Sequence, residues 1–160
     1  MVAPDDITGA VWAAPGEPGT LWRRRGPAIT AHYLACPAVR FQLYLAYQDG
    51  LPSGGFLLSF VNCVARIADL WVTNPNEERY ERVYRLAIAA SYEDGQVAEL
   101  TTYASIPSRV AALLRCGFQD CLRDHLMVSS RDGLPTEAFD CQMLDNDAAF
   151  LQGPRPTFLT

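Results

Sequence analysis

Residues 64–92 read VARIADLWV, then TNPN, then EERYERVYRLAIAASY, and this stretch predicts most about the fold. The segment VARIADLWV is dense in apolar and β-branched residues, which is typical of a buried strand. The segment TNPN is a turn by composition, and the apolar residues of Glu77–Tyr92 then recur at three- and four-residue steps, as in a helix. The positions on this helical face are Tyr80, Val83, Tyr84, Ala87 and Ile88.

A further strand follows the helix, at residues 97–104. A strand, a helix and another strand in succession require a crossover connection, which makes the two strands parallel when they share a sheet. We therefore expect Val64–Val72 and residues 97–104 to be parallel neighbours, with the helix packed on one face of the sheet.

The residues before Glu77 predict two adjacent antiparallel hairpins, formed by the strands at 40–47, 55–62 and 64–72. Residues 40–47 and 55–62 read as strands separated by a turn, and a short helix at residues 27–35 precedes them. Residues 1–26 carry two Pro-Gly breakers and read as an irregular N-terminal arm. Residues 27–160 are then expected to form one domain.

The chain after this unit predicts one more helix and two more strands. The helix spans residues 105–116, with proline in its first turn and glycine just past its end. Residues 119–129 and 139–144 read as the last two strands. The order after the arm is β-β-β-α-β-α-β-β, which predicts an α+β protein with a mixed, mostly antiparallel sheet flanked by helices.

Composition limits the classes of function. The chain has 160 residues, a net charge of −5 and a pI near 4.9. Neutralising phosphates requires surplus positive charge, so we expect no nucleic-acid partner. The N-terminal residues lack the pattern of a secretory signal, and no apolar run approaches the length of a membrane span. We therefore expect a cytoplasmic protein that does not insert into membranes.

The residues that bind metals in other proteins show no recognised spacing in this chain. The five cysteines contain no CxxC pair, and His32 and His125 lie far apart with no nearby ligand pattern. We expect no metal site. We expect the thiols, Cys63 among them, to be mostly small buried side chains in a reducing compartment.

Three local features together resemble the GNAT acyltransferase superfamily. Residues 55–60 (GFLLSF) and 65–72 (ARIADLWV) are similar to its third and fourth strands. Residues 108–118 (SRVAALLRCGF) are similar to its last helix, which ends in Gly-Phe, and Glu77–Tyr92 takes the place of its cofactor-facing helix. The resemblance implies a GNAT-like fold in which the fourth and fifth strands splay apart at their C-terminal ends.

The same resemblance implies a site and an activity. In the family an acyl-CoA lies between the splayed strands and bonds the backbone of the fourth strand, which implies Leu70, Trp71 and Val72 as cofactor-binding residues. Asp69 has the position of a general base on that strand, and Tyr103 on the neighbouring strand is the candidate general acid. The implied function is N-acyl transfer to an unknown amine, on a small molecule or a protein. Both candidates also have a structural interpretation, Asp69 as a strand-end carboxylate that bonds a loop and Tyr103 as a packing residue.

The chain departs from the family where the cofactor's phosphates bind. The family's loop has the pattern Arg/Gln-x-x-Gly-x-Gly/Ala, because glycine lets the backbone approach the pyrophosphate. Here Glu78 falls at the first position, with Glu81 and Val83 at the glycines, and no shift of register supplies a glycine. The tyrosine that many family enzymes place on the last helix is Leu113. We therefore expect acetyl-CoA to bind weakly or not at all.

Two hypotheses follow from these features. The first is an N-acyltransferase with Asp69 as base, and the second is a catalytically silent GNAT-like domain that binds a partner or a small ligand in the former cofactor cleft. Chains of this kind also resemble the second half of longer proteins with two GNAT-like domains. A second such domain, or a second copy of the chain, is therefore an expected partner.

Overall fold

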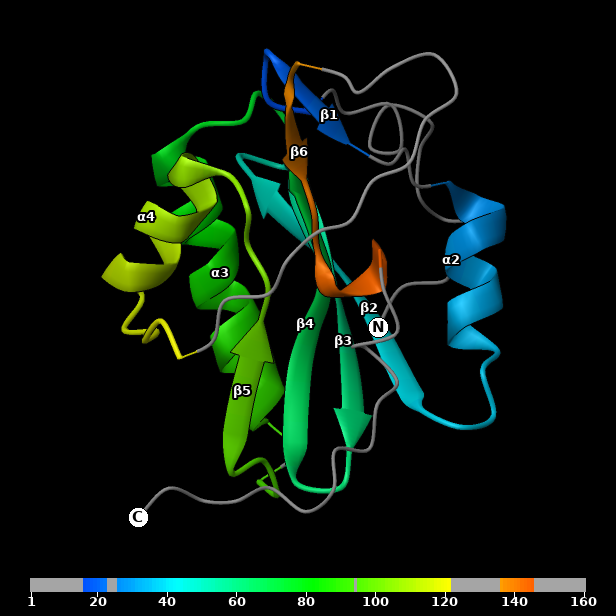
Figure 1. Cartoon of the computed structure of the whole chain (residues 1–160). Helices are drawn as coiled ribbons and strands as arrows, with labels where there is room; N and C mark the ends of the chain where they lie inside the picture. Colours follow the sequence, from blue (N-terminus) through cyan, green and yellow to red (C-terminus); the bar gives the residue numbers. More distant parts are fainter. Residues whose placement is uncertain (1–15, 23–25, 94, 122–135, 146–160) are drawn as a thin grey trace.

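The computed structural model describes residues 16–22, 26–93, 95–121 and 136–145, and these form an α+β structure (Figure 1). The elements in chain order are β1 (Thr20–Trp22), α2 (Pro27–Leu34), β2 (Arg40–Gln48), β3 (Leu51–Val61), β4 (Val64–Val72), α3 (Glu77–Tyr92), β5 (Glu99–Thr102), α4 (Pro107–Arg115), β6 (Ala138–Asp140) and the 3-10 turn η2 (Met143–Asp145). The predicted order from the first helix to the last is confirmed.

The main sheet has four strands in the order β2-β3-β4-β5. The pairs β2–β3 and β3–β4 are antiparallel, and β4–β5 is parallel, so the sheet is mixed as predicted. A two-residue turn joins β2 to β3, and its residues Asp49 and Gly50 both have positive φ, 52° and 78°. This left-handed geometry matches the twist of a tight hairpin, and aspartate and glycine adopt it more readily than other residues.

The pairing of β4 with β5 stops before β4 ends. It runs from Val64 opposite Glu99 to Ile67 opposite Thr102, whereas β4 continues to Val72. The C-terminal half of β4 therefore has no strand partner on the β5 side among the described residues. The parallel pairing is confirmed, and it ends at the C-terminal side, where the divergence was expected.

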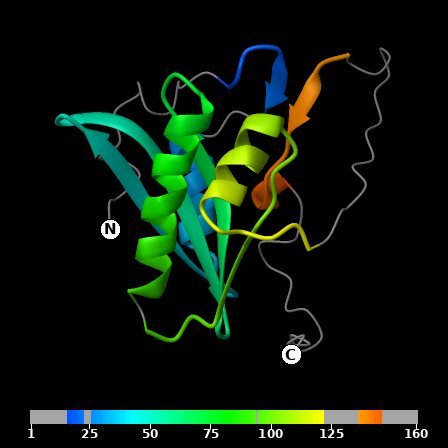
Figure 2. The same cartoon turned by 90° about the vertical axis from the view of Figure 1, so that its left-hand side faces the viewer.

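Helices cover both faces of this sheet. Figure 1 shows α3 and α4 on one side and α2 on the other, and Figure 2 shows α3 and α4 side by side in front of the strands. Successive residues of a strand point to opposite faces, so each strand supplies two apolar cores. Leu58 on β3 is fully buried toward α3, and its neighbour Leu57 is buried toward α2. Each such side chain contributes roughly 2–3 kcal/mol through burial.

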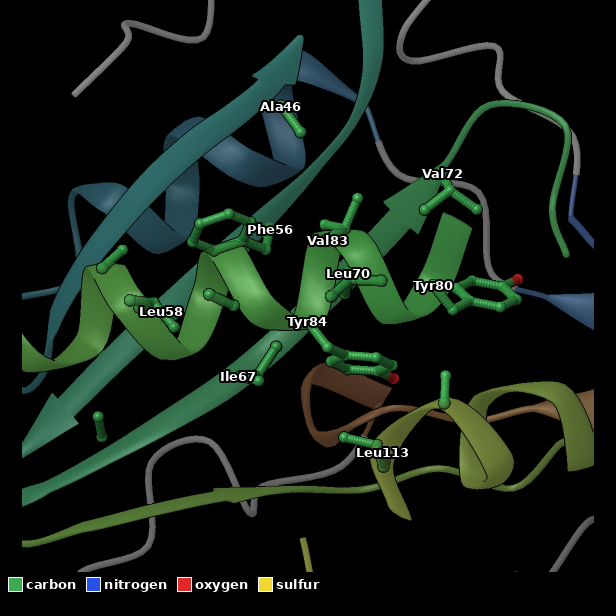
Figure 3. Packing of buried hydrophobic residues seen from close by; sticks show 14 of the residues in the cluster. Ala46, Phe56, Leu58, Ile67, Leu70, Val72, Tyr80, Val83, Tyr84 and Leu113 are labelled. Atoms are coloured by element: carbon green, nitrogen blue, oxygen red, sulfur yellow. The ribbon is translucent and has the colours of Figure 1, made fainter. Parts of the chain in front are cut away.

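The core under α3 and α4 holds the predicted helical face (Figure 3). Tyr80, Val83, Tyr84 and Ala87 are buried there as predicted. The core on the other face is built from β2, β3, β4, α2 and the 3-10 turn η2. Its members include Phe41, Leu43, Leu57, Ala68, Met143 and Leu144.

The prediction for the C-terminal strands needs correction. Residues 119–121 are not a strand, and residues 122–129 lie outside the described part of the chain. The strand predicted at 139–144 is only β6, and it pairs in parallel with β1 instead of joining the main sheet. The cause is local: the Asp145 carboxylate accepts the N–H of Gln142 at 2.9 Å, which closes the η2 turn. Strand β1 also lies within the arm predicted as irregular.

Candidate functional site between β4 and β5

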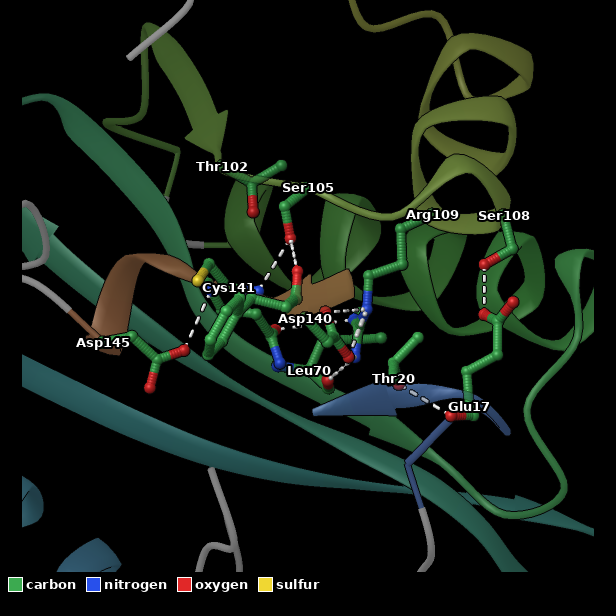
Figure 4. A network of polar contacts seen from close by, with 12 residues as sticks. Glu17, Thr20, Leu70, Thr102, Ser105, Ser108, Arg109, Asp140, Cys141 and Asp145 are labelled. Carbon is green, nitrogen blue, oxygen red and sulfur yellow. Dashed lines mark hydrogen bonds and ion pairs between the residues drawn. The ribbon is translucent and has the colours of Figure 1, made fainter. Parts of the chain in front are cut away.

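The opening between β4 and β5 is filled by side chains of this same chain. The backbone N–H of Leu70 donates to Oε1 of Gln142 at 2.7 Å, and the Leu70 carbonyl accepts from Nη2 of Arg109 at 2.9 Å (Figure 4). Closer to the start of β4, the hydroxyl of Thr102 donates to the Ile67 carbonyl at 3.0 Å. Side chains thus replace the missing strand, which satisfies buried backbone groups that would otherwise be unpaired.

Arg109 is the centre of this arrangement. Its Nε lies 2.9 Å from Oδ1 and 3.1 Å from Oδ2 of Asp140, and the angular geometry makes Oδ2 the hydrogen-bond acceptor. Nη2 also donates to Oδ2 at 2.9 Å. The guanidinium carbon lies 4.4 Å from the centre of the Tyr80 ring, a cation–π contact. Both charged side chains are 3% exposed, so this is a buried ion pair.

The surroundings keep Arg109 charged and the nearby tyrosines neutral. Burial alone lowers the pKa of Arg109, but Tyr84, Asp140 and Tyr80 together raise that pKa above its ordinary value. Burial raises the pKa of Tyr80 to about 12, although Arg109 opposes this. Burial likewise raises the pKa of Tyr84, and Arg109 opposes this as well. At neutral pH the site therefore holds one cation, one carboxylate and two neutral phenols.

The carboxylate of this pair belongs to a small unit that we call the clasp, residues 16–22 and 136–145. Its two strands pair in parallel, with Thr20 opposite Ala138. Ser105 fastens it to the turn before α4: the hydroxyl donates to the Phe139 carbonyl at 2.5 Å and accepts the N–H of Cys141 at 2.8 Å. The carboxylate of Glu17 also accepts a hydrogen bond from the hydroxyl of Ser108 on α4.

The predicted catalytic residues both lie beside the core under α2. Tyr103 was expected on the strand next to β4, but β5 ends at Thr102, so Tyr103 lies one residue beyond that strand. Asp69 is 3% exposed and pairs with Leu57, which belongs to the core on that face. Trp71 and Tyr103 are partly buried against the same core. Ala68 is an extra residue in β4, because Leu57 pairs with Asp69 but Leu58 pairs with Ile67. Such bulges re-aim neighbouring side chains and are common beside functional sites.

The predicted cofactor-binding residues fall on different sides of β4. The side chains of Leu70 and Val72 are buried in the core under α3, whereas Trp71 faces the opposite core. The backbone N–H and carbonyl of Leu70 are both bonded, by Gln142 and Arg109 respectively. Binding of a cofactor to the backbone of Leu70, Trp71 and Val72 stays a prediction.

The residues predicted to replace the phosphate-loop glycines lie inside α3. The helix begins at Glu77, and the Asn76 side chain accepts the N–H of Arg79 at 2.9 Å as its N-cap. Glu81 and Val83 follow in the next turn, where backbone N–H groups bond within the helix. Val83 is 2% exposed and packs beside Gly54. Its side chain is thus part of the core.

The acidic side chains at the start of α3 are paired with arginines. Glu81 lies 2.8 Å from Arg85 and 2.6 Å from Arg115, and Glu78 lies 3.1 Å from Arg82. These pairs are exposed or partly exposed and contribute little to stability. Their positive partners do reduce the negative potential of the carboxylates at this end of the helix.

The sequence analysis missed Arg109, Asp140 and Gln142. A signal existed for Arg109, because it stands three and four residues before Ala112 and Leu113, on the buried face of α4. An arginine at a core position of a helix is unusual unless it is paired. The sequence carried no comparable signal for Asp140 or Gln142.

The order β2-β3-β4-β5, with a parallel last pair that parts after Ile67 and a helix that crosses between its strands, is the arrangement the resemblance implied. The strand order and the parallel β4–β5 pair agree with the GNAT-like arrangement expected from the sequence. No family model matches the chain, and no curated protein matches it in sequence.

Two solved structures of the aminoglycoside N-acetyltransferase AAC(6')-Iy are similar to this chain. One is a complex with CoA, with 17% identity over 64% of this chain and 84% of that chain, at a TM-score of 0.46. The other is a complex with the bisubstrate analogue CoA-S-monomethyl-acetylneamine, with 18% identity over 64% and 77% of the two chains, also at 0.46.

Other sequence candidates show no comparable assembly. His32 is exposed on α2, Cys63 is partly buried in the turn between β3 and β4, and His125 lies outside the described residues. Within the described ranges, no group of three or more His, Cys, Asp or Glu residues could hold a metal ion. In the same ranges, no helix combines the length and apolar character needed to cross a membrane.

Proposed function

We propose that this chain is a catalytically silent GNAT-like domain that acts by binding a ligand or partner. The observation that carries the proposal is the state of Leu70, whose N–H and carbonyl are both bonded by side chains of the same chain. Acyl-CoA would need these groups if it bonded the fourth strand as the family resemblance implies. It would therefore have to displace the side chains of Gln142 and Arg109 from that backbone.

The start of α3 supports the same proposal. A pyrophosphate at this helix would meet side chains where the family has glycines, because Glu81 and Val83 take those positions within α3. Glutamate and valine also lack the small size that lets a backbone wrap around phosphates. We expect acetyl-CoA to bind weakly or not at all.

Calorimetric titration with acetyl-CoA tests this directly, together with an assay for CoA thiol release in the presence of a panel of amines. We expect no measurable binding and no release above the enzyme-free rate. A dissociation constant in the low micromolar range, with amine-dependent release of thiol, would overturn the proposal. The full chain is used, because the clasp is drawn from both of its ends.

One observation favours the N-acyltransferase as a second candidate. Asp69 and Tyr103 both lie beside the core under α2, and Asp69 follows a bulge. In that reading Asp69 accepts the proton of the attacking amine and Tyr103 donates a proton to the leaving thiolate. If any amine is acylated, Asp69→Asn should abolish turnover while the exposed control Asp49→Asn keeps it.

A further inference from the structure

The guanidinium of Arg109 is held partly by groups outside the clasp. The Tyr80 ring lies against it at 4.4 Å, and the Leu70 carbonyl accepts from Nη2 at 2.9 Å. The clasp supplies the other contacts: Asp140 accepts from both Nε and Nη2, and Gln142 lies at a longer 3.5 Å from Nη1. The contacts with Tyr80 and Leu70 would remain if the carboxylate left, so the cation is partly preorganised as a binding group.

The strand that brings Asp140 is short. β6 has three residues, and among the described residues its only strand partner is β1, which also has three. Beyond the ion pair with Arg109, the Ser105 hydroxyl attaches it to the turn before α4 through the Phe139 carbonyl and the Cys141 N–H. Leu21 on β1 is 37% exposed, and Ala138 on β6 is exposed. Short segments with few buried contacts open locally at lower free energy than the core does.

The residues after β6 are anchored differently. Met143 and Leu144 in η2 are each 4% exposed and belong to the core under α2. Gln142, next to them, bonds Leu70. The strand pair can therefore move away from Arg109 while η2 remains in place, with residue 141 as the point of separation.

We propose that the β1–β6 strand pair is a removable cover, and that beneath it Arg109 forms a binding site for an organic carboxylate, with Asp140 as the built-in occupant. The inference deepens the proposed function, because it names the chemistry of the ligand that the silent domain would bind in the former cleft. The ligand's carboxylate replaces that of Asp140 on the Nε and Nη2 edge of Arg109.

The geometry of the pair favours a carboxylate over other anions. The present occupant is a carboxylate with both oxygens within 3.1 Å of Nε, and its removal would leave a space of carboxylate size. A planar group with two oxygens matches the planar edge of a guanidinium. The Tyr80 ring over the guanidinium leaves that edge as the side on which a ligand would bind.

The test uses the full chain with Asp140→Ala, and sodium acetate as the probe. Removing Asp140 leaves Arg109 buried without its carboxylate, so the melting temperature should fall. Acetate should then raise it, by about 3–6 °C at ten times its dissociation constant. Sodium chloride at equal ionic strength and acetamide at equal concentration should not, because neither supplies a carboxylate.

Two matched variants separate the site from general salt effects. Arg109→Met combined with Asp140→Ala should show no acetate-specific rise, because the cation is gone. Glu137→Ala removes an exposed carboxylate from the same clasp and should also show none. The wild-type chain should show none either, since Asp140 competes at a high effective concentration. If acetate stabilises Asp140→Ala no more than acetamide does, the carboxylate site is wrong.

Amide hydrogen exchange tests the removable cover in the wild-type chain. The N–H of Cys141, which bonds Ser105, should exchange through local opening, far faster than the N–H of Leu58 in the core. Equal exchange rates, limited by global unfolding, would overturn the cover. Asp140→Asn keeps the side-chain shape and should increase Cys141 exchange at least tenfold.

These outcomes are separable from those of the proposed function. Tight binding of acetyl-CoA to the wild-type chain would refute the silent domain, and it would leave the acetate result on Asp140→Ala unchanged. If Asp140→Ala does not fold in buffer, recovery of its circular dichroism signal by acetate but not by acetamide is the same evidence for the site. Failure of both ligands to restore the signal, with Asp140→Asn folded, would count against it.

Discussion

Arg109 and Asp140 form an ion pair in which each side chain is only 3% exposed, and it joins α4 to the strand β6 across the open half of β4. The two residues are 31 positions apart in the chain. Because the same guanidinium also bonds the Leu70 carbonyl at 2.9 Å, one side chain connects three elements. Replacing Arg109 and Asp140 singly and together separates the contribution of each side chain to stability from that of their interaction.

We expect Arg109→Met to lower the free energy of unfolding by about 3–5 kcal/mol, because it leaves the Asp140 carboxylate buried without its partner. The double variant Arg109→Met/Asp140→Leu should be more stable than the single variant, since no uncompensated charge remains. Urea titrations of the wild type, Arg109→Met, Asp140→Leu and the double variant give the coupling energy as a double-mutant cycle. Strictly additive effects would mean that the ion pair is not energetically coupled.

Loss of the Gln142 side chain should also lower the free energy of unfolding, because Gln142 fills part of the same opening beside β4. Gln142→Ala leaves the buried N–H of Leu70 without an acceptor, which costs about 1–3 kcal/mol. Gln119→Ala is the matched control, because that side chain is exposed, and we expect a change within about 0.5 kcal/mol. Equal midpoints for both variants in urea would contradict the role assigned to Gln142.

Stability should fall at alkaline pH because of the buried tyrosines. Tyr80 has a pKa of about 12 in the folded protein, against about 10 for an unfolded tyrosine. Between these values the unfolded chain has lost the proton and the folded chain keeps it, so unfolding becomes easier as pH rises. The loss is absent below about pH 9, grows by about 1.4 kcal/mol per pH unit between about pH 10 and pH 12, and levels off above the folded pKa.

Urea midpoints at pH 8, 10, 11 and 12 measure this effect. Tyr80→Phe removes the titrating hydroxyl and should show a smaller decline over the same range, although Tyr84, whose pKa is also raised, remains. A decline of the same size in Tyr80→Phe would assign the alkaline loss to other groups.

Gly55 should not tolerate even alanine. A Cβ at this position would lie 2.5 Å from Cζ2 of Trp71 and 2.8 Å from the Tyr44 carbonyl, closer than atoms can pack. We expect Gly55→Ala to cost about 1–3 kcal/mol through overpacking, and to shift the fluorescence of Trp71. Gly26→Ala is the control, because nothing lies within 4 Å of its Cβ position, and its effect should be small. Comparable losses in the two variants would show that the Trp71 contact is not the cause.

The sequence by itself determined the main elements, because strand and helix periodicity are local properties. The stretch 64–92 predicted β4, the turn and α3, and the crossover rule predicted the parallel β4–β5 pair. The same local reasoning failed for residues 139–144. Their apolar residues suggested one strand, whereas Met143 and Leu144 turn away into the core under α2.

Only the tertiary structure decided what occupies the opening beside β4. Leu70, Arg109 and Gln142 are separated by 39 and 33 positions, and no repeat or spacing links them. They meet because β5 ends early and leaves polar backbone groups that must find partners wherever the fold supplies them. The face on which Asp69 lies was likewise decided by the bulge at Ala68, since one extra residue reverses the alternation of a strand.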